Sequence, residues 1–303
     1  EDEPISYICR IFGAHSFHTC VLSVCRDCGI GPVAVKISTG EGGNTHYLRP
    51  TLIRNLVEAV DGTIVECCTA YGGTRQDPAK HWQTIHDHGF DSIFKVDLMD
   101  EFGEFNIPVR DTTHIKYDIV GDHLQNYDFM INLVHFKGHT MAGYGGAIKN
   151  QSIGVASANG KMLIHSAGRT EDATHKLKAW SKSVGSKRHD MFLESMAASA
   201  QAVVDYMQGR IIYINVMNNL SVDCDCDASP KAPEVQDVGI LASTDPVALD
   251  QACLDIIYRM PTDEANNPEP LRKRISSRNG QHTVDYAVSI GLGTQKYTIV
   301  IID

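Results

Sequence analysis

The chain has 303 residues, of which 43% are hydrophobic and 21% charged, a composition typical of a folded globular protein rather than a disordered one. Its 27 Lys and Arg residues against 37 Asp and Glu give a formal net charge of -10, which argues against nucleic acid or an anionic membrane surface as a partner. No uncharged apolar run approaches the roughly 18 residues of a membrane span. The acidic start Glu1–Pro4 lacks the basic region of a secretory signal. We therefore expect a cytoplasmic protein with no membrane partner.

Short β-branched runs alternate with amphipathic segments in the first third of the chain. The pattern predicts strands over 32–38, 63–68 and 91–96, and helices that begin at Pro50 and at about residue 77. His81 is expected on an exposed face of the second helix. This β-α-β-α-β rhythm favours a parallel sheet, because parallel strands need helical crossovers. The polar stretch 100–118, rich in β-branched residues, is typical of a hairpin insertion.

The rest of the chain continues the alternation. Strands are predicted over 129–134, 210–216, 238–243 and 297–302. Helices are predicted over 191–207 and 246–258, the second with Asp245 as its N-cap and Asp250 on its surface. The fold class is therefore α/β, with a doubly wound, mainly parallel sheet flanked by helices. We expect one unit over 1–303; two lobes, about 1–125 and 126–303 with a cleft between them, are the alternative.

Four loops directly follow predicted strands, at 39–44, 69–75, 135–146 and 221–227. In open α/β sheets the ligand crevice lies beyond the carboxyl ends of the strands, so these loops are the candidates for a site. None of them carries the glycine pattern of a dinucleotide-binding turn or of a P-loop, so we predict neither NAD nor a P-loop nucleotide.

The loop after residue 134 carries the densest chemistry. His135 and His139 are four residues apart, and a helical turn there would place both imidazoles on one face, as a metal site needs. Gly145 and Gly146 allow the backbone to approach a ligand closely and to bind an anion. Lys149 follows at a predicted helix start, where a low-dielectric pocket would make it a nucleophile or an attachment point.

Cysteines and one carboxylate add further candidates. The nine cysteines are scattered, which favours reduced thiols over a disulfide framework. Cys224 and Cys226 could chelate a soft metal, but they need His135 or His139 to complete a site; a polar turn with incidental thiols is the other interpretation. A redox role for the Cys25-x-x-Cys28 pair is a weaker alternative. Glu66 either pairs with Lys36 across the sheet or acts as an acid in the site.

Taken together, these motifs resemble the family known as domain of unknown function 362. The residues that carry the resemblance are Val35–Lys36, Gly40–Glu41, Asn44, Glu66, Thr69–Gly72, His135–His139, Gly145–Asn150, Asp223–Cys226 and Gly239–Asp250. Many members are labelled iron–sulfur proteins because they contain a ferredoxin insert. The insert would be expected after His165, and no cysteine lies between Cys68 and Cys224, so we predict no ferredoxin insert and no inherited ferredoxin function.

A more distant resemblance is to the nickel-pincer lactate racemases. His139, the Ala142–Gly146 stretch, Lys149 and His165 are similar to that family's pattern. The resemblance implies that Lys149 attaches a nickel–pincer nucleotide, that His165 is a metal ligand and that His139 is an acid/base. The family's Asp-x-Thr-Arg phosphate loop is replaced here by residues 39–44, and its second acid/base His is missing.

These observations predict a metal- or metal-cofactor-dependent enzyme, an isomerase, racemase or oxidoreductase, acting on a small anionic hydroxy or oxo acid. The alternatives are an iron–sulfur or metal carrier that uses the Cys224/Cys226 turn, and a non-catalytic phosphate- or anion-binding module. The metal would be nickel, iron or zinc, alone or within a metal–organic cofactor, and a homodimer is an open alternative to a monomer.

The predicted catalytic residues are His139, Lys149 and Glu66. The predicted cofactor-binding residues are Lys149, Gly145, Gly146, Lys36, Asn44 and Tyr71. The predicted metal ligands are His135, His139, His165, Cys224 and Cys226.

Overall fold

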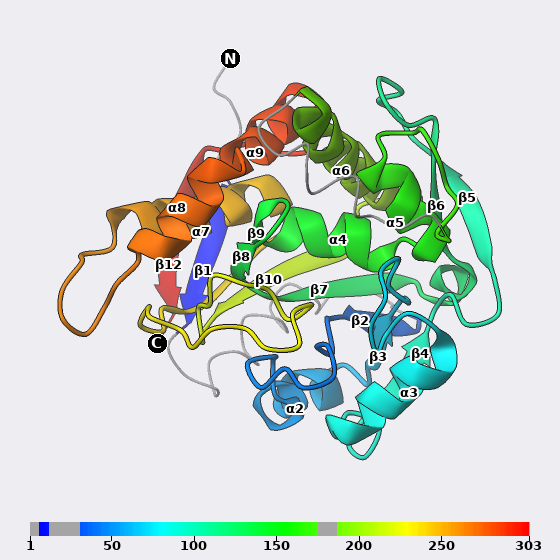
Figure 1. Ribbon diagram of the computed structural model, residues 1–303, viewed down its shortest axis with the longest axis horizontal. Helices are drawn as coiled ribbons and strands as arrows, with labels where there is room; N and C mark the ends of the chain where they lie inside the picture. The colour runs from blue at the N-terminus through cyan, green and yellow to red at the C-terminus, as the bar shows by residue number, and fades with distance from the viewer. Residues whose placement is uncertain (1–5, 12–30, 175–186, 303) are drawn as a thin grey trace.

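The computed structural model describes residues 6–11, 31–174 and 187–302, which build one eight-stranded sheet (Figure 1). In spatial order the strands are β12 (Tyr297–Ile302), β1 (Ser6–Ile11), β11 (Gly239–Ser243), β10 (Ile211–Met217), β7 (Phe129–His135), β2 (Val33–Lys36), β3 (Thr63–Glu66) and β4 (Lys95–Leu98). Only β11 among these strands runs antiparallel to its neighbours; every other neighbouring pair is parallel. The predicted mainly parallel α/β sheet is confirmed. The sheet combines strands from both ranges proposed as lobes.

Helices flank the two faces of the sheet. Two of them, α2 (Pro50–Ala59) and α3 (Pro78–Asp87), lie on one side in Figure 1. The helices on the other side are α4 (Ala147–Val155), α5 (Ala158–His165), α6 (Lys187–Tyr206), α7 (Pro246–Arg259), α8 (Glu269–Ser277) and α9 (Gly280–Ser289). A single turn of 3-10 helix, Asp122–Asn126, precedes β7. None of the described helices has both the length and the apolar character that a membrane crossing requires.

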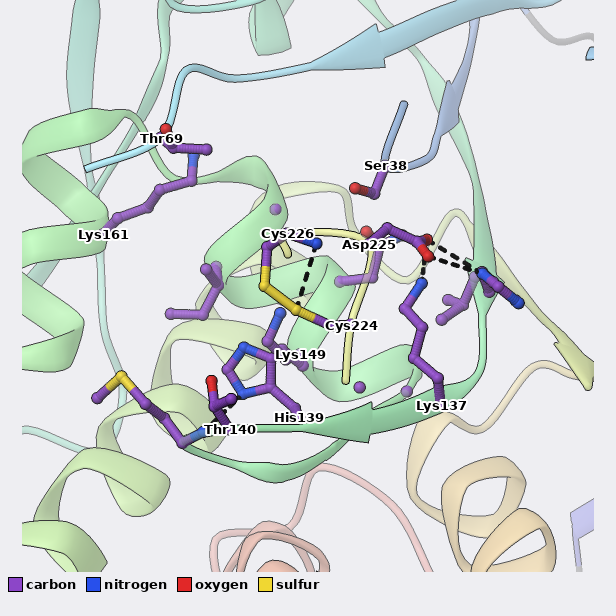
Figure 2. A pocket seen from close by; sticks show the side chains of 18 of the residues that line it. Ser38, Thr69, Lys137, His139, Thr140, Lys149, Lys161, Cys224, Asp225 and Cys226 are labelled. Atoms are coloured by element: carbon purple, nitrogen blue, oxygen red, sulfur yellow. Dashed lines mark hydrogen bonds and ion pairs between the residues drawn. A yellow bond between two sulfur atoms is a disulfide. The ribbon is translucent and has the colours of Figure 1, made fainter. Parts of the chain in front are cut away.

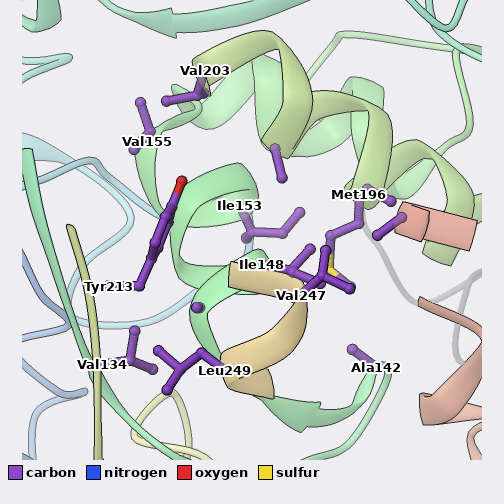
Figure 3. Packing of buried hydrophobic residues seen from close by; sticks show 14 of the residues in the cluster. Val134, Ala142, Ile148, Ile153, Val155, Met196, Val203, Tyr213, Val247 and Leu249 are labelled. Atoms are coloured by element: carbon purple, nitrogen blue, oxygen red, sulfur yellow. The ribbon is translucent and has the colours of Figure 1, made fainter. Parts of the chain in front are cut away.

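A hydrophobic core lies on each face of the sheet, between the strands and the helices that cover that face. Two cores form because side chains point alternately to the two faces along each central strand. In β7, Met130 and Val134 belong to the core under α4, α6 and α7, whereas Ile131 and Leu133 belong to the core under α2 and α3. Figure 3 shows Ile148 and Ile153 of α4 within the first of these cores. Both faces of the central strands are buried, which explains their continuous apolar runs.

The main differences from the predicted elements lie in turns. The predicted insertion is a hairpin, β5 (Glu104–Pro108) with β6 (Tyr117–Gly121), as expected. The strand predicted over 91–96 begins only at Lys95, because residues 90–94 form hydrogen-bonded turns after α3. The helical turn that would have placed His135 and His139 on one face does not form. The chain there is extended and forms a second hairpin, β8 (Lys137–His139) with β9 (Gly143–Gly145).

One carboxylate of α7 fixes the start of α4. Asp245 caps α7 as predicted, accepting hydrogen bonds from the amides of residues 247 and 248. Asp250, which its helical position predicts to be solvent-facing, is instead fully buried. It accepts the amides of Ala147 and Ile148 at 2.7 and 3.1 Å, and so caps α4 from another helix. Removal from water outweighs these hydrogen bonds and raises the pKa of Asp250 to about 6. This cap holds the first turn of α4, which carries Lys149.

Candidate functional site

A cavity of about 530 Å³ opens where β2, β3 and β7 end at their carboxyl edges. Eleven of the predicted site residues line it: Lys36, Glu66, Tyr71, His135, His139, Gly145, Gly146, Lys149, His165, Cys224 and Cys226. Figure 2 shows several of them around the space, including His139 from β8 and Lys149 from α4. The sequence therefore brings these side chains together from distant segments, as the position of the loops at the ends of parallel strands predicts.

Asn44 is the predicted cofactor-binding residue that does not line the cavity. Its side-chain amide donates to the carbonyl of Asp227 at 2.8 Å, and its oxygen accepts the amides of His46 and Tyr47. The amide of Glu41 also donates to the carbonyl of Asp225 at 2.7 Å. Asn44 therefore joins the loop after β2 to the Cys224/Cys226 turn instead of contacting a ligand in the cavity.

Lys149 is the third residue of α4 and reaches the cavity with its amine. Within the described residues its Nζ has no hydrogen-bond or ion-pair partner, and the side chain is partly accessible through the cavity. Removal from bulk water and then the positive charges of Lys137, Lys36 and Arg75 lower the pKa of Lys149, against the opposing effect of Asp225, and the pKa that results is about 7. An amine with this pKa is partly neutral at neutral pH and is therefore a nucleophile.

Two of the three histidines that line the cavity, His139 and His165, are neutral but differ in which ring nitrogen carries the proton. His139 accepts the amides of Met141 and Ala142 at Nδ1, at 3.2 and 2.9 Å, so the proton of its neutral ring is on Nε2. His165 donates from Nδ1 to the carbonyl of Lys161 at 2.6 Å, which leaves a lone pair on Nε2. Burial lowers the pKa of His139 well below its usual range and that of His165 to about 4. His139 is thus a hydrogen-bond donor, and His165 is a base or a ligand.

Glu66 is an anchor for a buried arginine. One carboxylate oxygen accepts Arg75 at 2.6 Å, and the other accepts the Thr39 hydroxyl and the Nε2 of His81 at 2.5 and 3.1 Å. Burial opposes ionisation, but the charges of Arg75 and His81 outweigh it and hold the pKa of Glu66 well below its usual range. A carboxylate that stays ionised and is fully engaged cannot act as the acid predicted for this position.

The partners of Glu66 also correct two other expectations. The proposed cross-sheet pair with Lys36 is replaced by the ion pair with Arg75. His81, which the sequence places on an exposed helix face, is fully buried against Glu66. Arg75 further contacts Tyr71, whose hydroxyl accepts from Nη2 at 3.1 Å, and burial raises the pKa of Tyr71 to about 12. Arg75 and Tyr71 thus form a fixed, polar wall of the cavity.

A second buried cluster holds the Cys224/Cys226 turn. Asp225, between the two cysteines, forms an ion pair with Lys137 and accepts from the Nδ1 of His135 at 3.0 Å. Burial opposes ionisation of Asp225, yet His135 and Lys137 hold its pKa well below the usual range. The Nε2 of His135 lies 2.7 Å from the carbonyl of Asn218. Each ring nitrogen of His135 therefore faces an oxygen that can only accept, so the metal-ligand role predicted for His135 does not fit this arrangement.

The cavity has two further lysines with neutral partners. Lys36 donates to the carbonyl of Ile37 and to Asn150 Oδ1, and burial lowers its pKa to about 8. Lys161 donates to the carbonyl of Ala156.

The sequence analysis did not identify four charged residues that line the cavity, Lys137, Lys161, Arg75 and Asp225. Two of these residues could have been found from the sequence, because each lies between two predicted metal ligands. Lys137 lies between His135 and His139, and Asp225 lies between Cys224 and Cys226.

His139, Cys224 and Cys226 form a group that could hold a metal ion, since their ligand atoms lie within 4.8 Å of one another. Two features of the described arrangement oppose such an ion. The two sulfurs are joined in a disulfide, and the His139 nitrogen that faces them carries the proton of the neutral ring (Figure 2). A metal at this group requires reduced thiols and a different protonation of His139, and the same holds for a nickel-containing cofactor. Cys25 and Cys28 lie outside the described residues.

The two predicted cofactor-binding glycines differ in what surrounds them. A Cβ at Gly145 would have only the Cδ of Lys149 near it, at 3.8 Å, so this glycine borders open space beside the lysine. A Cβ at Gly146 would lie 2.3 Å from a carboxylate oxygen of Asp250. Gly146 is therefore required by the cap of α4, and only Gly145 leaves room for a ligand.

Comparisons with known proteins give a family but no activity. The comparison with curated proteins found no match to this chain. One similar structure is the lactate racemase apoprotein from Thermoanaerobacterium thermosaccharolyticum, at 13% sequence identity and a TM-score of 0.48, over 86% of this chain and 60% of that one. This chain thus spans less than two thirds of that protein. The family described as "Domain of unknown function (DUF362)" matches residues 33–255, most of the chain, and the protein belongs to this family.

Proposed function

We propose that the protein is an enzyme that binds a small anionic hydroxy or oxo acid in this cavity and moves a proton on it, as an isomerase or racemase. The observation that carries the proposal is the charge of the cavity wall in a chain whose net charge is -10. The cationic lining residues outnumber the carboxylates: Lys36, Arg75, Lys137, Lys149, Lys161 and Arg278 against Glu66 and Asp225. Such an excess, partly shielded from water, favours an anion of small size.

The two histidines supply complementary groups for proton transfer. The Nε2 lone pair of His165 would accept a proton from the hydroxyl-bearing carbon of a hydroxy acid, or from the carbon beyond the carbonyl group of an oxo acid. The Nε2–H of His139 would donate a hydrogen bond to the hydroxyl or carbonyl oxygen and stabilise the charge that develops there. The low pKa of each ring keeps both in these neutral forms at neutral pH.

Thermal unfolding with added anions tests the binding half of the proposal. Lactate, pyruvate and phosphate at millimolar concentration should raise the melting temperature of the wild type, because a bound anion gives the cationic wall its missing counter-charge. Lys149→Met should reduce this shift, whereas Lys116→Met, at an exposed lysine, should leave it unchanged. Absence of any shift, or equal shifts in both variants, would overturn the proposal.

An assay of turnover tests whether the protein moves a proton on the bound acid. Enantiopure lactate and malate, incubated in deuterated water, should lose optical purity and gain deuterium at the carbon that bears the hydroxyl. His165→Ala should abolish both changes while the protein remains folded by circular dichroism. If anions stabilise the wild type but neither acid changes, the enzyme assignment fails and the anion-binding module remains.

The His139/Cys224/Cys226 group favours a metal carrier as the second candidate function. Metal analysis of protein purified under reducing conditions separates the two. A metal-dependent enzyme should lose a bound transition metal in His139→Ala and His165→Ala. A carrier that uses this group should lose the metal in Cys224→Ser, Cys226→Ser and His139→Ala, yet keep it in His165→Ala.

A further inference from the structure

We propose that Lys149 forms a covalent imine with the carbonyl carbon of a small 2-oxo acid. The inference rests on the proposed function only in taking a small anionic acid as the occupant of the cavity. It adds a chemical step at a named atom, the Nζ of Lys149, and it narrows the substrate class to acids with a carbonyl group.

Lys149 differs from the other cavity lysines in its lack of a partner. Lys36 donates to Ile37 and Asn150, Lys137 pairs with Asp225, and Lys161 donates to a main-chain carbonyl. Among the described residues, the Nζ of Lys149 has no acceptor to hold it as an ammonium. Removal from water and the charges of neighbouring cations favour the neutral amine and lower its pKa to about 7.

The position of Lys149 is fixed and its surroundings leave room for a substrate. The Asp250 cap holds the first turn of α4, so the stem of Lys149 leaves a rigid element. Gly145 has no side chain to fill the space beside that stem. Figure 2 shows the Lys149 amine and the His139 imidazole directed into the same space. The Nε2–H of His139 can therefore polarise a carbonyl oxygen.

The proposed step balances without an oxidant or a reductant. The Nζ lone pair attacks the carbonyl carbon, and the π electrons of the C=O bond move to oxygen. The oxygen takes up the two protons that the amine loses and leaves as water, and a C=N bond forms. The charge of the substrate carboxylate is met by the cationic lining, which also includes Lys36 and Lys161.

Reductive trapping tests the proposal on the intact 303-residue chain. Wild type is incubated with glyoxylate or pyruvate and sodium cyanoborohydride, which delivers hydride to the imine carbon and leaves a stable secondary amine. The intact mass should rise by that of the oxo acid less one oxygen atom, and peptide fragmentation should place the addition on Lys149. Lys149→Arg keeps the positive charge but cannot form an imine, so the trapped fraction should fall at least about tenfold.

The outcomes separate this inference from the proposed function. If wild type gains no adduct from either acid, or if the adduct lies on exposed lysines and persists in Lys149→Arg, the imine proposal is wrong. Thermal stabilisation by pyruvate in that same sample would then leave the anion-binding cavity intact. If Lys149→Arg does not fold, the fragmentation map of the wild type alone decides between Lys149 and the other lysines.

Discussion

Replacing Lys149 with Met should make the protein more stable, and most of the gain should depend on pH. The unfolded chain holds this lysine with a pKa of 10.5, whereas the folded protein lowers the pKa to about 7. Below pH 7 the folded state must therefore hold an unfavourable charge, at an upper bound of about 5 kcal/mol. Because the amine is partly accessible through the cavity, we expect a gain of about 2 to 4 kcal/mol in the free energy of unfolding at pH 6.

The sign follows from proton binding. Between pH 7 and 10.5 the unfolded state binds more protons at this site than the folded state, so wild-type stability rises with pH there. Urea unfolding at pH 6 and at pH 10 measures the difference, with Lys116→Met as the control at an exposed lysine. The advantage of Lys149→Met should shrink steadily toward pH 10. A variant that is less stable than wild type at pH 6, or that differs by the same amount at both pH values, would refute the reasoning.

The remaining predictions concern the frame of the site. Asp225→Asn should lower the free energy of unfolding by about 3 to 5 kcal/mol at pH 7, whereas Asp227→Asn should have little effect in the same urea titration. Because the pKa of Asp225 is held below its usual range, this contribution is present above about pH 4 and is lost as the pH falls further. Gly146→Ala should lower the melting temperature, at a cost of about 1 to 3 kcal/mol, by displacing the Asp250 carboxylate. Gly145→Ala should leave the melting temperature unchanged and weaken anion binding; the reverse pattern would contradict the placement of the two glycines.

Much of the fold could be predicted because local signals agreed with the final packing. The apolar runs at 32–38, 63–68, 129–134 and 210–216 are strands of the central sheet, and Pro50 and Asp245 mark helix starts where expected. Strands followed by polar loops also predicted which segments meet at one edge. The segment around His135 and His139 misled the prediction because two histidines at a spacing of four fit a helix as well as two extended strands. The register there depends on pairing with β9, which leaves no local signal.

The roles of single site residues were harder to predict, because they depend on partners far away in the chain. Glu66 lies at a strand end beside the cavity, yet Arg75 and His81 occupy its oxygens. Asp250 sits on a helix whose sequence indicates an outward position, but it serves another helix a hundred residues away. Nothing in the spacing of either residue reveals these contacts. The convergence of His139, His165 and Lys149 followed from topology, whereas their protonation states followed only from their hydrogen bonds.

The contacts of Asp225 with β7 and β8 determine how the neighbouring residues Cys224 and Cys226 can be studied by substitution. The Asp225 side chain forms an ion pair with Lys137 and a hydrogen bond with His135. These contacts hold the turn 224–226 without the side chains of Cys224 or Cys226. Serines at both positions should therefore lie where the sulfurs of Cys224 and Cys226 lie. A difference in metal binding or turnover between the double-serine variant and the wild type then reports on the chemistry of the sulfurs. It does not report on a change in the structure of the cavity.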